Sequence, residues 1–318
     1  LLVKFLLLSM HEKSAVLDGT IPAHLQVVEV LKSTLQAIQN FGLTHSAHRE
    51  EVMLCLMKPE SEFTGLKSST WLDLRGKTLQ VLPCPNTVPN LFIMLPTLDE
   101  EEALPGIYDR IPLEELKALG YSSRIVIVDG GSTDRTLDIA EELGCEVINQ
   151  WGEGKGIGIR QGFENFLESD DDELVMLDCD GTYHPEEIIR LVTSIPKSGI
   201  AIGDRLRGDL KPDAMTSTNW IGNQLLTWLA VALHGKPIND LCSGFWAFSR
   251  ESLQRLQLNS MRFEIEAEMY TSCAHLDIPI RHVPITYSKR KGHAKLGSIK
   301  DGTSIARKLI IRRIFPTP

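Results

Sequence analysis

Short apolar segments and helical segments alternate along the chain after residue 90. The apolar segments have the length of buried strands. Five strands are expected, at residues 91–95, 124–128, 146–149, 174–177 and 200–203. Helices are expected after the first four of them, at residues 113–119, 134–143, 158–167 and 185–194. Buried strands that alternate with helices predict an α/β fold whose central sheet is mostly parallel and covered by helices on both faces.

A polar cluster follows each of the first four expected strands. These clusters are residues 96–102, 128–136, 154–162 and 178–180. In mostly parallel sheets, ligands bind beyond the carboxyl ends of the strands. We therefore expect the four clusters to form one ligand site.

The last cluster, Asp178-Cys179-Asp180, has the most specific chemistry. Two carboxylates one residue apart at the end of a buried strand are costly unless a cation neutralises them. Their hard oxygens suit Mg²⁺ or Mn²⁺, and such ions commonly bridge to the phosphates of a bound nucleotide. An Asp at a strand end is also a common cap of the next helix, so the triplet alone leaves both interpretations open.

The other three clusters each allow a structural and a ligand-binding interpretation. Acidic residues 99–102 can begin the next helix. Asp129, followed by two glycines, can accept hydrogen bonds from a base or ribose, whereas residues 132–134 can cap the helix that follows. Lys155 lies among glycines at an expected helix start, which favours an anion, although the spacing of a P-loop is absent.

Composition and charge describe an ordinary globular protein with one basic end. Its 318 residues, 42% hydrophobic and 24% charged, suffice for one large domain with an appendage or for two domains. No apolar run approaches the roughly 20 residues of a membrane span. Six scattered cysteines favour a reducing compartment over a zinc site or a disulfide framework. Residues 278–318 contain ten Lys and Arg but one Asp, in a chain of net charge −9, which suggests a phosphate-rich or anionic-membrane partner.

Residues 1–90 lack the alternating pattern. A helix is expected at residues 25–41 and strands at 51–57 and 78–82, before a proline-rich connection that is typical of a domain boundary. No motif assigns a role to this region, and an accessory domain, an interaction arm and a regulatory lid are all open. We expect a small α+β N-terminal appendage, a main domain and a basic amphipathic C-terminal helix, at residues 1–90, 91–300 and 301–318.

Four further stretches follow the clusters. They are Gly203-Asp204-Arg205, DLCSGFWAF at residues 240–248, FEIEAE at residues 263–268 and VPITYSKRKGHAKL at residues 283–296. With the clusters, and in this order, they make residues 91–300 resemble the family-2 glycosyltransferases of the GT-A (Rossmann-like) fold. More narrowly, the chain resembles the polyprenyl-phosphate (dolichyl-phosphate) mannose and glucose synthases.

The resemblance implies a role for each matched position on the donor side. Asp178 and Asp180 are implied to hold a divalent ion, Mg²⁺ or Mn²⁺, on the diphosphate. The other implied contacts of the nucleotide sugar are Pro96, Thr97, Glu100, Asp129, Lys155, Cys179, Arg290 and Lys295. Among these, Arg290 and Lys295 are implied to close a loop over the phosphates, and Cys179 to pass its backbone beside the nucleotide.

On the acceptor side, the resemblance implies that Arg205 faces the acceptor phosphate. The catalytic candidates are Asp180, Arg205, Asp240 and Glu266. A phosphate acceptor is anionic at neutral pH and needs no strong base, whereas a hydroxyl acceptor would require a carboxylate such as Asp240 or Glu266. A metal and cations beside a leaving nucleoside diphosphate suit an inverting displacement at the sugar C1.

Three departures from the family pattern concern ligand contacts. Gly130 stands where many relatives have a second ribose-facing carboxylate, and Thr182 stands where many have a Gln near the metal. Residues 215–223 lack the basic residue often found before the IGN sequence. The acceptor side therefore rests on fewer matched residues than the donor side.

The implied enzyme is a metal-dependent, inverting hexosyltransferase. It would move glucose or mannose from a UDP or GDP sugar to a polyprenyl (dolichyl) phosphate, and the sequence does not decide the sugar or the base. The alternatives are transfer to a soluble sugar or small acid, and a non-catalytic module that binds a nucleotide sugar. No nucleic-acid partner is expected, and the sequence does not decide between a monomer and a homo-oligomer.

Two apolar segments bear on membrane contact. Residues 220–233 fit either a core helix or a membrane-facing helix. Residues 305–315 combine Ile and Leu with four basic residues, a pattern of helices that lie in an anionic interface or present a solvated face. Together they favour a cytoplasmic protein attached peripherally to the cytoplasmic face of a membrane.

Overall fold

The computed structural model describes residues 70–72, 78–80, 88–290 and 298–317. The chain divides into two units, Leu1–Cys84 and Pro85–Pro318.

In the first unit, β1 (Thr70–Leu72) pairs antiparallel with β2 (Thr78–Gln80). The strand expected at residues 78–82 thus corresponds to β2. The helix expected at residues 25–41 and the strand expected at residues 51–57 lie outside the described residues.

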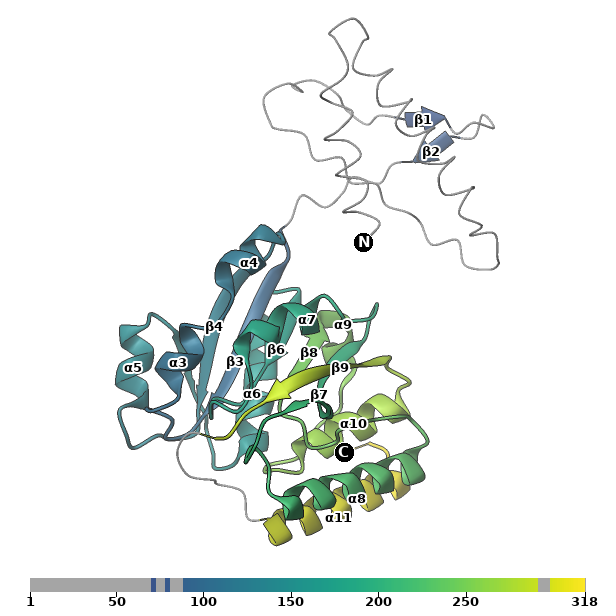
Figure 1. The fold of residues 1–318 in the computed structure, drawn as a ribbon. Helices are drawn as coiled ribbons and strands as arrows, with labels where there is room; N and C mark the ends of the chain where they lie inside the picture. The colour runs from purple at the N-terminus through teal and green to yellow at the C-terminus, as the bar shows by residue number, and fades with distance from the viewer. Residues whose placement is uncertain (1–69, 73–77, 81–87, 291–297, 318) are drawn as a thin grey trace, which may run out of the picture. The chain divides into compact units, whose positions relative to one another are not determined.

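The second unit is built on one seven-stranded sheet (Figure 1), with the strand order β5-β4-β3-β6-β8-β7-β9. Its strands are β3 (Asn90–Thr97), β4 (Ser122–Asp129), β5 (Glu146–Asn149), β6 (Glu173–Met176), β7 (Ile200–Leu210), β8 (Trp246–Ser249) and β9 (Ile280–Tyr287). Only β8 among them runs antiparallel to its neighbours, β6 and β7. All other pairings in this sheet are parallel. The prediction of an α/β fold with a mostly parallel sheet is confirmed.

Helices cover both faces of this sheet (Figure 1). They are α3 (Leu104–Tyr108), α4 (Leu113–Ala118), α5 (Thr136–Glu142), α6 (Lys155–Glu168), η1 (Pro185–Glu187), α7 (Ile188–Val192), α8 (Ser217–His234), α9 (Arg250–Arg255), α10 (Ile265–His275) and α11 (Ser298–Ile314). Because successive strand side chains point to opposite faces, β3 contributes to two buried clusters. Phe92 and Met94 lie in a cluster with residues of α6 and α8 to α11. Leu91 and Ile93 lie in the other cluster, with residues of α3, α4, α5 and α7.

Several boundaries differ from the sequence-based expectation, among them those of β3, β4, α5 and α11, and two of the differences have a clear physical reason. Helix α6 begins at Lys155 because its glycines allow close packing and do not form a turn: a Cβ at Gly156 would lie 2.6 Å from the carbonyl oxygen of Ser260. Strand β7 continues beyond residue 203 because, after a register shift, its end pairs with β9. The segment at residues 185–194 begins as a 3₁₀ turn, η1, before α7.

Helices α8 and α11 lie side by side in this unit, and α10 lies against both (Figure 1). Tyr270 on α10 donates a hydrogen bond to the carbonyl oxygen of Ala230 on α8 (3.2 Å). Arg312 on α11 donates to Glu268 on α10 (3.0 Å). Within the described part of the chain, no helix is long and apolar enough to span a membrane.

Candidate active site

Two loops at the carboxyl edge of the sheet are tied to each other by hydrogen bonds. The backbone N–H of Thr133, after β4, donates to Asp99, after β3 (2.7 Å). The backbone N–H of Glu100 donates to Thr136 Oγ1 (2.9 Å). The acidic segment at residues 99–102, which also fitted a helix start, therefore joins the two loops and fixes the wall of the site.

Pro96, Thr97 and Asp129 lie at the base of these loops. Pro96 and Thr97 end β3, and Thr97 is in register with Asp129 at the end of β4. The buried Asp129 carboxylate accepts hydrogen bonds from the backbone N–H groups of Gly131 (2.9 Å) and Ser132 (3.1 Å). Asp129 therefore shapes the glycine turn, and a carboxylate has lone pairs enough to accept from a ligand as well.

Lys155, at the start of α6, joins two carboxylates from distant segments. Its Nζ lies 2.7 Å from Asp178 Oδ1 and 2.7 Å from Glu266 Oε1. Burial lowers the pKa of Lys155, but the two carboxylates outweigh burial and hold this pKa above the usual lysine value. Burial raises the pKa of Glu266, and the Lys155 charge opposes this effect. Lys155 is therefore a fixed positive charge beside Asp178.

Arg290 connects Asp180 to the loop after β3. Its Nη1 lies 3.2 Å from Asp180 Oδ2, and its Nη2 donates to Glu100 Oε1 (2.7 Å). The other oxygen of Asp180 accepts from the backbone N–H (3.0 Å) and the hydroxyl (2.5 Å) of Thr182. Thr182 therefore orients Asp180, and Arg290 gives it a positive neighbour.

Close packing holds the backbone around these carboxylates. Cys179 is buried between them, and burial raises the pKa of its thiol well above the usual range, so the thiol stays neutral. The backbone N–H of Gly244 donates to the Tyr183 hydroxyl (2.6 Å), and a Cβ at Gly244 would overlap the Asp178 carboxylate. Glycine at this position therefore leaves the space that Asp178 occupies.

A second buried ion pair lies beside β7. Arg205 donates through Nε (2.7 Å) and Nη2 (2.8 Å) to the two oxygens of Asp240, and Asn223 Nδ2 also donates to Asp240 (2.6 Å). The Arg205 guanidinium lies over the Tyr287 ring, 5.0 Å from its centroid. Burial raises the pKa of Asp240, but the Arg205 charge and the hydrogen bonds outweigh burial, and the pKa lies below its usual value.

These contacts change how the acceptor-side residues are interpreted. An ionised Asp240 that accepts several hydrogen bonds is a weak proton acceptor. Its surroundings therefore favour a positioning role, in which it orients Arg205, over the general-base role considered for a hydroxyl acceptor. Glu266 instead pairs with Lys155, a residue that the resemblance implies on the donor side.

The ion pairs form two groups, Lys155 with Asp178 and Glu266, and Arg290 with Glu100 and Asp180. The two groups meet in the chain at the Asp178-Cys179-Asp180 triplet. Lys295 lies outside the described residues. Among the residues that the structure describes, no three His, Cys, Asp or Glu side chains lie close enough to bind a metal ion by themselves.

Sequence reasoning missed several partners of these residues. Lys155 and Glu266 are 111 positions apart, and nothing in either local pattern indicates the pairing. Asn223 stands within the largely apolar segment 220–233, and the structure shows that it is buried there, where an Asn requires a hydrogen-bond partner. Thr182 and Tyr183 follow the carboxylate pair after Gly181; Thr182 was noted only as a departure from the family pattern, and neither was assigned a role.

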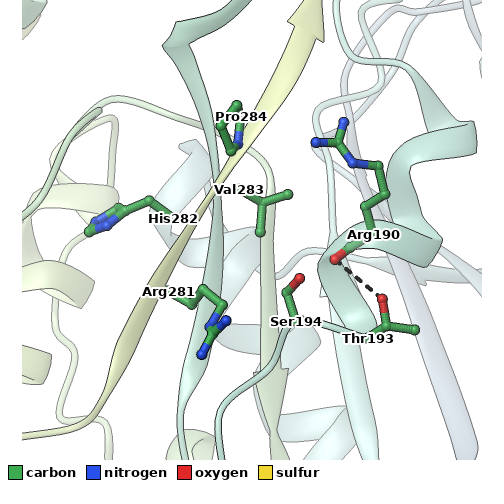
Figure 2. A pocket seen from close by; sticks show the side chains of 7 residues that line it. All are labelled: Arg190, Thr193, Ser194, Arg281, His282, Val283 and Pro284. Carbon is green, nitrogen blue, oxygen red and sulfur yellow. Dashed lines mark hydrogen bonds between the residues drawn. The ribbon is translucent and has the colours of Figure 1, made fainter. Parts of the chain in front are cut away.

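A separate shallow pocket lies between the end of α7 and β9 (Figure 2). It is lined by Arg190, Thr193, Ser194, Arg281, His282, Val283 and Pro284. The hydrogen bond drawn there runs from Thr193 Oγ1 to the carbonyl oxygen of Arg190 (3.5 Å). None of the residues linked at the strand ends lines this pocket, so we place the candidate site at the strand ends.

Comparison with known proteins shows the family to which the chain belongs. The model of Glycosyl transferase family 2 matches residues 92–257, more than half of the chain. A glycosyltransferase of Haloferax volcanii is 33% identical over 73% of this chain and 73% of its own length. A dolichyl-phosphate hexose transferase of the same organism is 28% identical over 70% of this chain and 94% of its own length.

Solved structures share the fold. One is glucosyl-3-phosphoglycerate synthase of Mycobacterium tuberculosis in complex with Mn²⁺, UDP-glucose and phosphoglyceric acid. It matches with a TM-score of 0.53 at 20% identity, over 72% of this chain and 81% of that chain. At this identity the likeness concerns the fold, and the sheet with its flanking helices is of the GT-A type.

Proposed function

This chain belongs to glycosyl transferase family 2 and is a glycosyltransferase, and from that premise we propose that it transfers one hexose from a nucleotide sugar to a polyprenyl phosphate. The proposed donor is a UDP or GDP sugar that carries glucose or mannose, with Mg²⁺ or Mn²⁺ at its diphosphate. The main observation in support is that Lys155 pairs with Asp178, and Arg290 with Asp180, at the carboxyl ends of the sheet strands.

The residues present fit a divalent ion that arrives with a nucleotide. Mg²⁺ is usually bound through one or two carboxylates, with phosphates and waters as the other ligands. Asp178 and Asp180 supply two such carboxylates, and the described residues contain no three-ligand cluster that would bind an ion alone. When bound, the ion would neutralise charge that develops on the leaving diphosphate.

Lys155 and Arg290 supply the positive charge of the chain itself. Each is held by a carboxylate outside the Asp178–Asp180 pair, Lys155 by Glu266 and Arg290 by Glu100. Their positions are therefore fixed before a diphosphate binds. Preorganised cations stabilise developing negative charge without a cost of reorganisation during the reaction. Glu266 and Glu100 act here as positioning residues.

The acceptor assignment rests on Arg205 and on the chemistry of phosphate. Arg205 keeps its orientation through Asp240, which Asn223 holds in turn. A phosphate acceptor is already ionised and requires no general base, which agrees with the engagement of Asp240 by hydrogen bonds. The name of the Haloferax volcanii dolichyl-phosphate hexose transferase supports the same acceptor class.

Transfer of radiolabel from a nucleotide sugar to lipid tests the proposal. The protein is incubated with labelled UDP-glucose or GDP-mannose, Mg²⁺ or Mn²⁺, and dolichyl phosphate in detergent. We expect a chloroform-soluble labelled product that requires the lipid and the metal ion. Asp178→Asn and Asp180→Asn are each expected to lower kcat/KM at least about a hundredfold, because each removes a carboxylate from the proposed ion site.

Asp170→Asn is the matched control, since it makes the same change on an exposed Asp before the amino end of β6. It is expected to leave transfer unchanged. A labelled product that stays in the water phase would show a soluble acceptor. No labelled product with either donor, or equal activity without Asp178 and Asp180, would contradict the proposal.

A further inference from the structure

We infer that the exposed faces of α8 and α11 form one docking surface for a membrane that contains anionic lipids. The inference goes beyond the proposed function, because it names the surface through which a lipid acceptor would be reached. Vesicle binding tests it without any sugar transfer.

The outer face of α8 is apolar and exposed. Ile221, Leu225 and Trp228 recur at helical spacing and are 53%, 63% and 70% exposed. Trp220, in the first turn of this helix, is 41% exposed. Helix α8 contains no Asp, Glu, Lys or Arg. A soluble surface rarely gathers two Trp and two large aliphatic side chains on one helix unless they bind something.

The outer face of α11 combines apolar and basic side chains. Ile310, Ile311 and Ile314 lie on the exposed face together with Arg307, and Phe315 follows the helix. The opposite face is buried, with Ile305, Leu309 and Arg312 turned toward the body. An amphipathic helix with Arg among large apolar side chains is typical of helices that lie in a membrane interface.

The two outer faces lie on the same side of this unit. The inner face of α8 contacts α10 through the hydrogen bond from Tyr270 to Ala230, and the inner face of α11 contacts α10 through Glu268 and Arg312. His234 of α8 also contacts the carbonyl oxygen of Leu309 on α11 (3.0 Å). Because both helices rest on α10 and lie side by side (Figure 1), their outward faces adjoin.

Charge identifies the partner as an anionic bilayer. Lys300, Arg307 and Arg313 are exposed on α11, whereas Asp301 is its only acidic residue. Lys and Arg near a membrane surface are attracted by anionic headgroups, and Trp side chains favour the headgroup level of the bilayer. A partner protein of ordinary composition would not require exposed Trp side chains and exposed basic side chains on the same surface.

The docking surface adjoins the acceptor side of the site. On the inner face of α8, Asn223 donates to Asp240, which holds Arg205. A helix with its side chains is about 10–12 Å thick. Docking through the outer face of α8 therefore brings Arg205 to about one helix diameter from the lipid headgroups.

Cosedimentation with two kinds of vesicle tests the inference. One is pure phosphatidylcholine, and the other is phosphatidylcholine with one third phosphatidylglycerol. We expect the full chain to bind the anionic vesicles more strongly, with a blue shift of Trp fluorescence and weakening by salt. Two double variants remove apolar side chains, Leu225→Ser with Trp228→Ser on α8 and Ile310→Ser with Ile314→Ser on α11. Each is expected to lower partitioning of the protein onto the anionic vesicles at least about tenfold.

Two further variants separate charge from apolar contact. Arg307→Gln with Arg313→Gln is expected to lower binding to the anionic vesicles by roughly tenfold and to change binding to the neutral vesicles little. Leu119→Ser with Trp151→Ser is the matched control, since it removes an exposed Leu and an exposed Trp outside α8 and α11. It is expected to bind like the unchanged chain. Thermal unfolding confirms that all variants remain folded.

Three outcomes would overturn the inference. They are no binding to either vesicle, equal binding by the helix variants and the unchanged chain, and self-association without lipid that the helix variants abolish. The last outcome, measured by light scattering, would identify a second copy as the occupant. Sugar transfer to lipid in detergent without vesicle binding would contradict only the docking surface. Vesicle binding without sugar transfer would contradict only the proposed function.

Discussion

Asp178 and Asp180 each lie beside a cationic side chain from a distant segment. This pairing allows two carboxylates to lie close together at the end of a buried strand. Lys155 and Arg290 offset the charge that two adjacent carboxylates would otherwise place at the end of a buried strand. Removing one partner of a buried pair costs more than the pair contributes, because it leaves a charge without compensation. The site is therefore sensitive to single substitutions.

Lys155→Met should expose this sensitivity. It leaves Asp178 and Glu266 close together without their shared cation, so we expect the free energy of unfolding to fall by about 3 kcal/mol at neutral pH. The loss should shrink toward about pH 5, because protonation of one carboxyl relieves the repulsion. Denaturant unfolding at both pH values measures it. Adding Glu266→Gln to Lys155→Met should recover part of the loss, and an unchanged loss in that double variant would contradict the explanation.

Gly244→Ala should disturb Asp178 directly. The added methyl would overlap the Asp178 carboxylate, and a displacement of about 1 Å can cost a hundredfold in rate. We expect a weaker thermal shift by nucleotide sugar with Mn²⁺ and a fall in kcat/KM of that order. Gly222→Ala is the control, because a Cβ there has open space within α8. Equal effects of the two substitutions would show that the space at Gly244 is unimportant.

At the scale of elements, Glu268 joins α10 to α11. Its carboxylate accepts hydrogen bonds from Arg312 and Lys308 of α11 and from the backbone N–H of Ser260. Burial raises the pKa of Glu268, but these partners outweigh burial and hold it below the usual value. A depressed pKa in the folded state contributes stability above the unfolded pKa, and that stability is lost as the pH falls.

The attachment of α11 should therefore depend on pH through Glu268. At pH 7 we expect Glu268→Gln to lower the free energy of unfolding by about 3 kcal/mol, since it leaves Arg312 buried without its counter-charge. As the pH falls below the usual glutamate range and Glu268 becomes protonated in the unchanged chain, the two proteins should converge. Thermal unfolding as a function of pH measures the difference, and a constant difference down to pH 3 would contradict this role.

At the scale of the whole molecule, the two hydrophobic clusters lie entirely within the unit Pro85–Pro318. Each cluster fills one side of the same sheet, so neither is complete without the strands that separate them. A core of this size is sufficient for independent folding.

A fragment of residues 85–318 should therefore fold alone. We expect one cooperative thermal transition, with a midpoint close to that of the same unit in the full chain, and an unchanged stabilisation by nucleotide sugar with Mn²⁺. Differential scanning calorimetry with and without ligand measures both. An insoluble fragment, or loss of the ligand shift, would show that residues 1–84 contribute to the fold or to the site.

The sequence predicted the repeating elements of this unit because hydrophobic periodicity is local. Strand β5 was expected at residues 146–149 and is found there, and the helical segment expected at residues 220–233 corresponds to α8, which begins three residues earlier and ends one residue later. The start of α6 was misjudged because glycine in a sequence indicates a turn, whereas Gly156 here serves close packing against Ser260. The motifs placed Asp178, Asp180 and Arg290 in one predicted site.

By itself, the sequence determined the alternation of strands and helices over residues 91–203, the polar clusters after the strands and the family, but it did not predict α3, β8, α9 or β9. The tertiary structure alone decided the partners: Lys155 with Glu266, Arg205 with Asp240 and Asn223, and α8 beside α11. The reason is that periodicity and capping act over a few residues. Ion pairs between segments 35 to 111 positions apart depend instead on which strands become neighbours in the sheet. Both the carboxylate pair and the cations Lys155 and Arg290 could be recognised from the chain, but which cation pairs with which carboxylate could be assigned only from the fold.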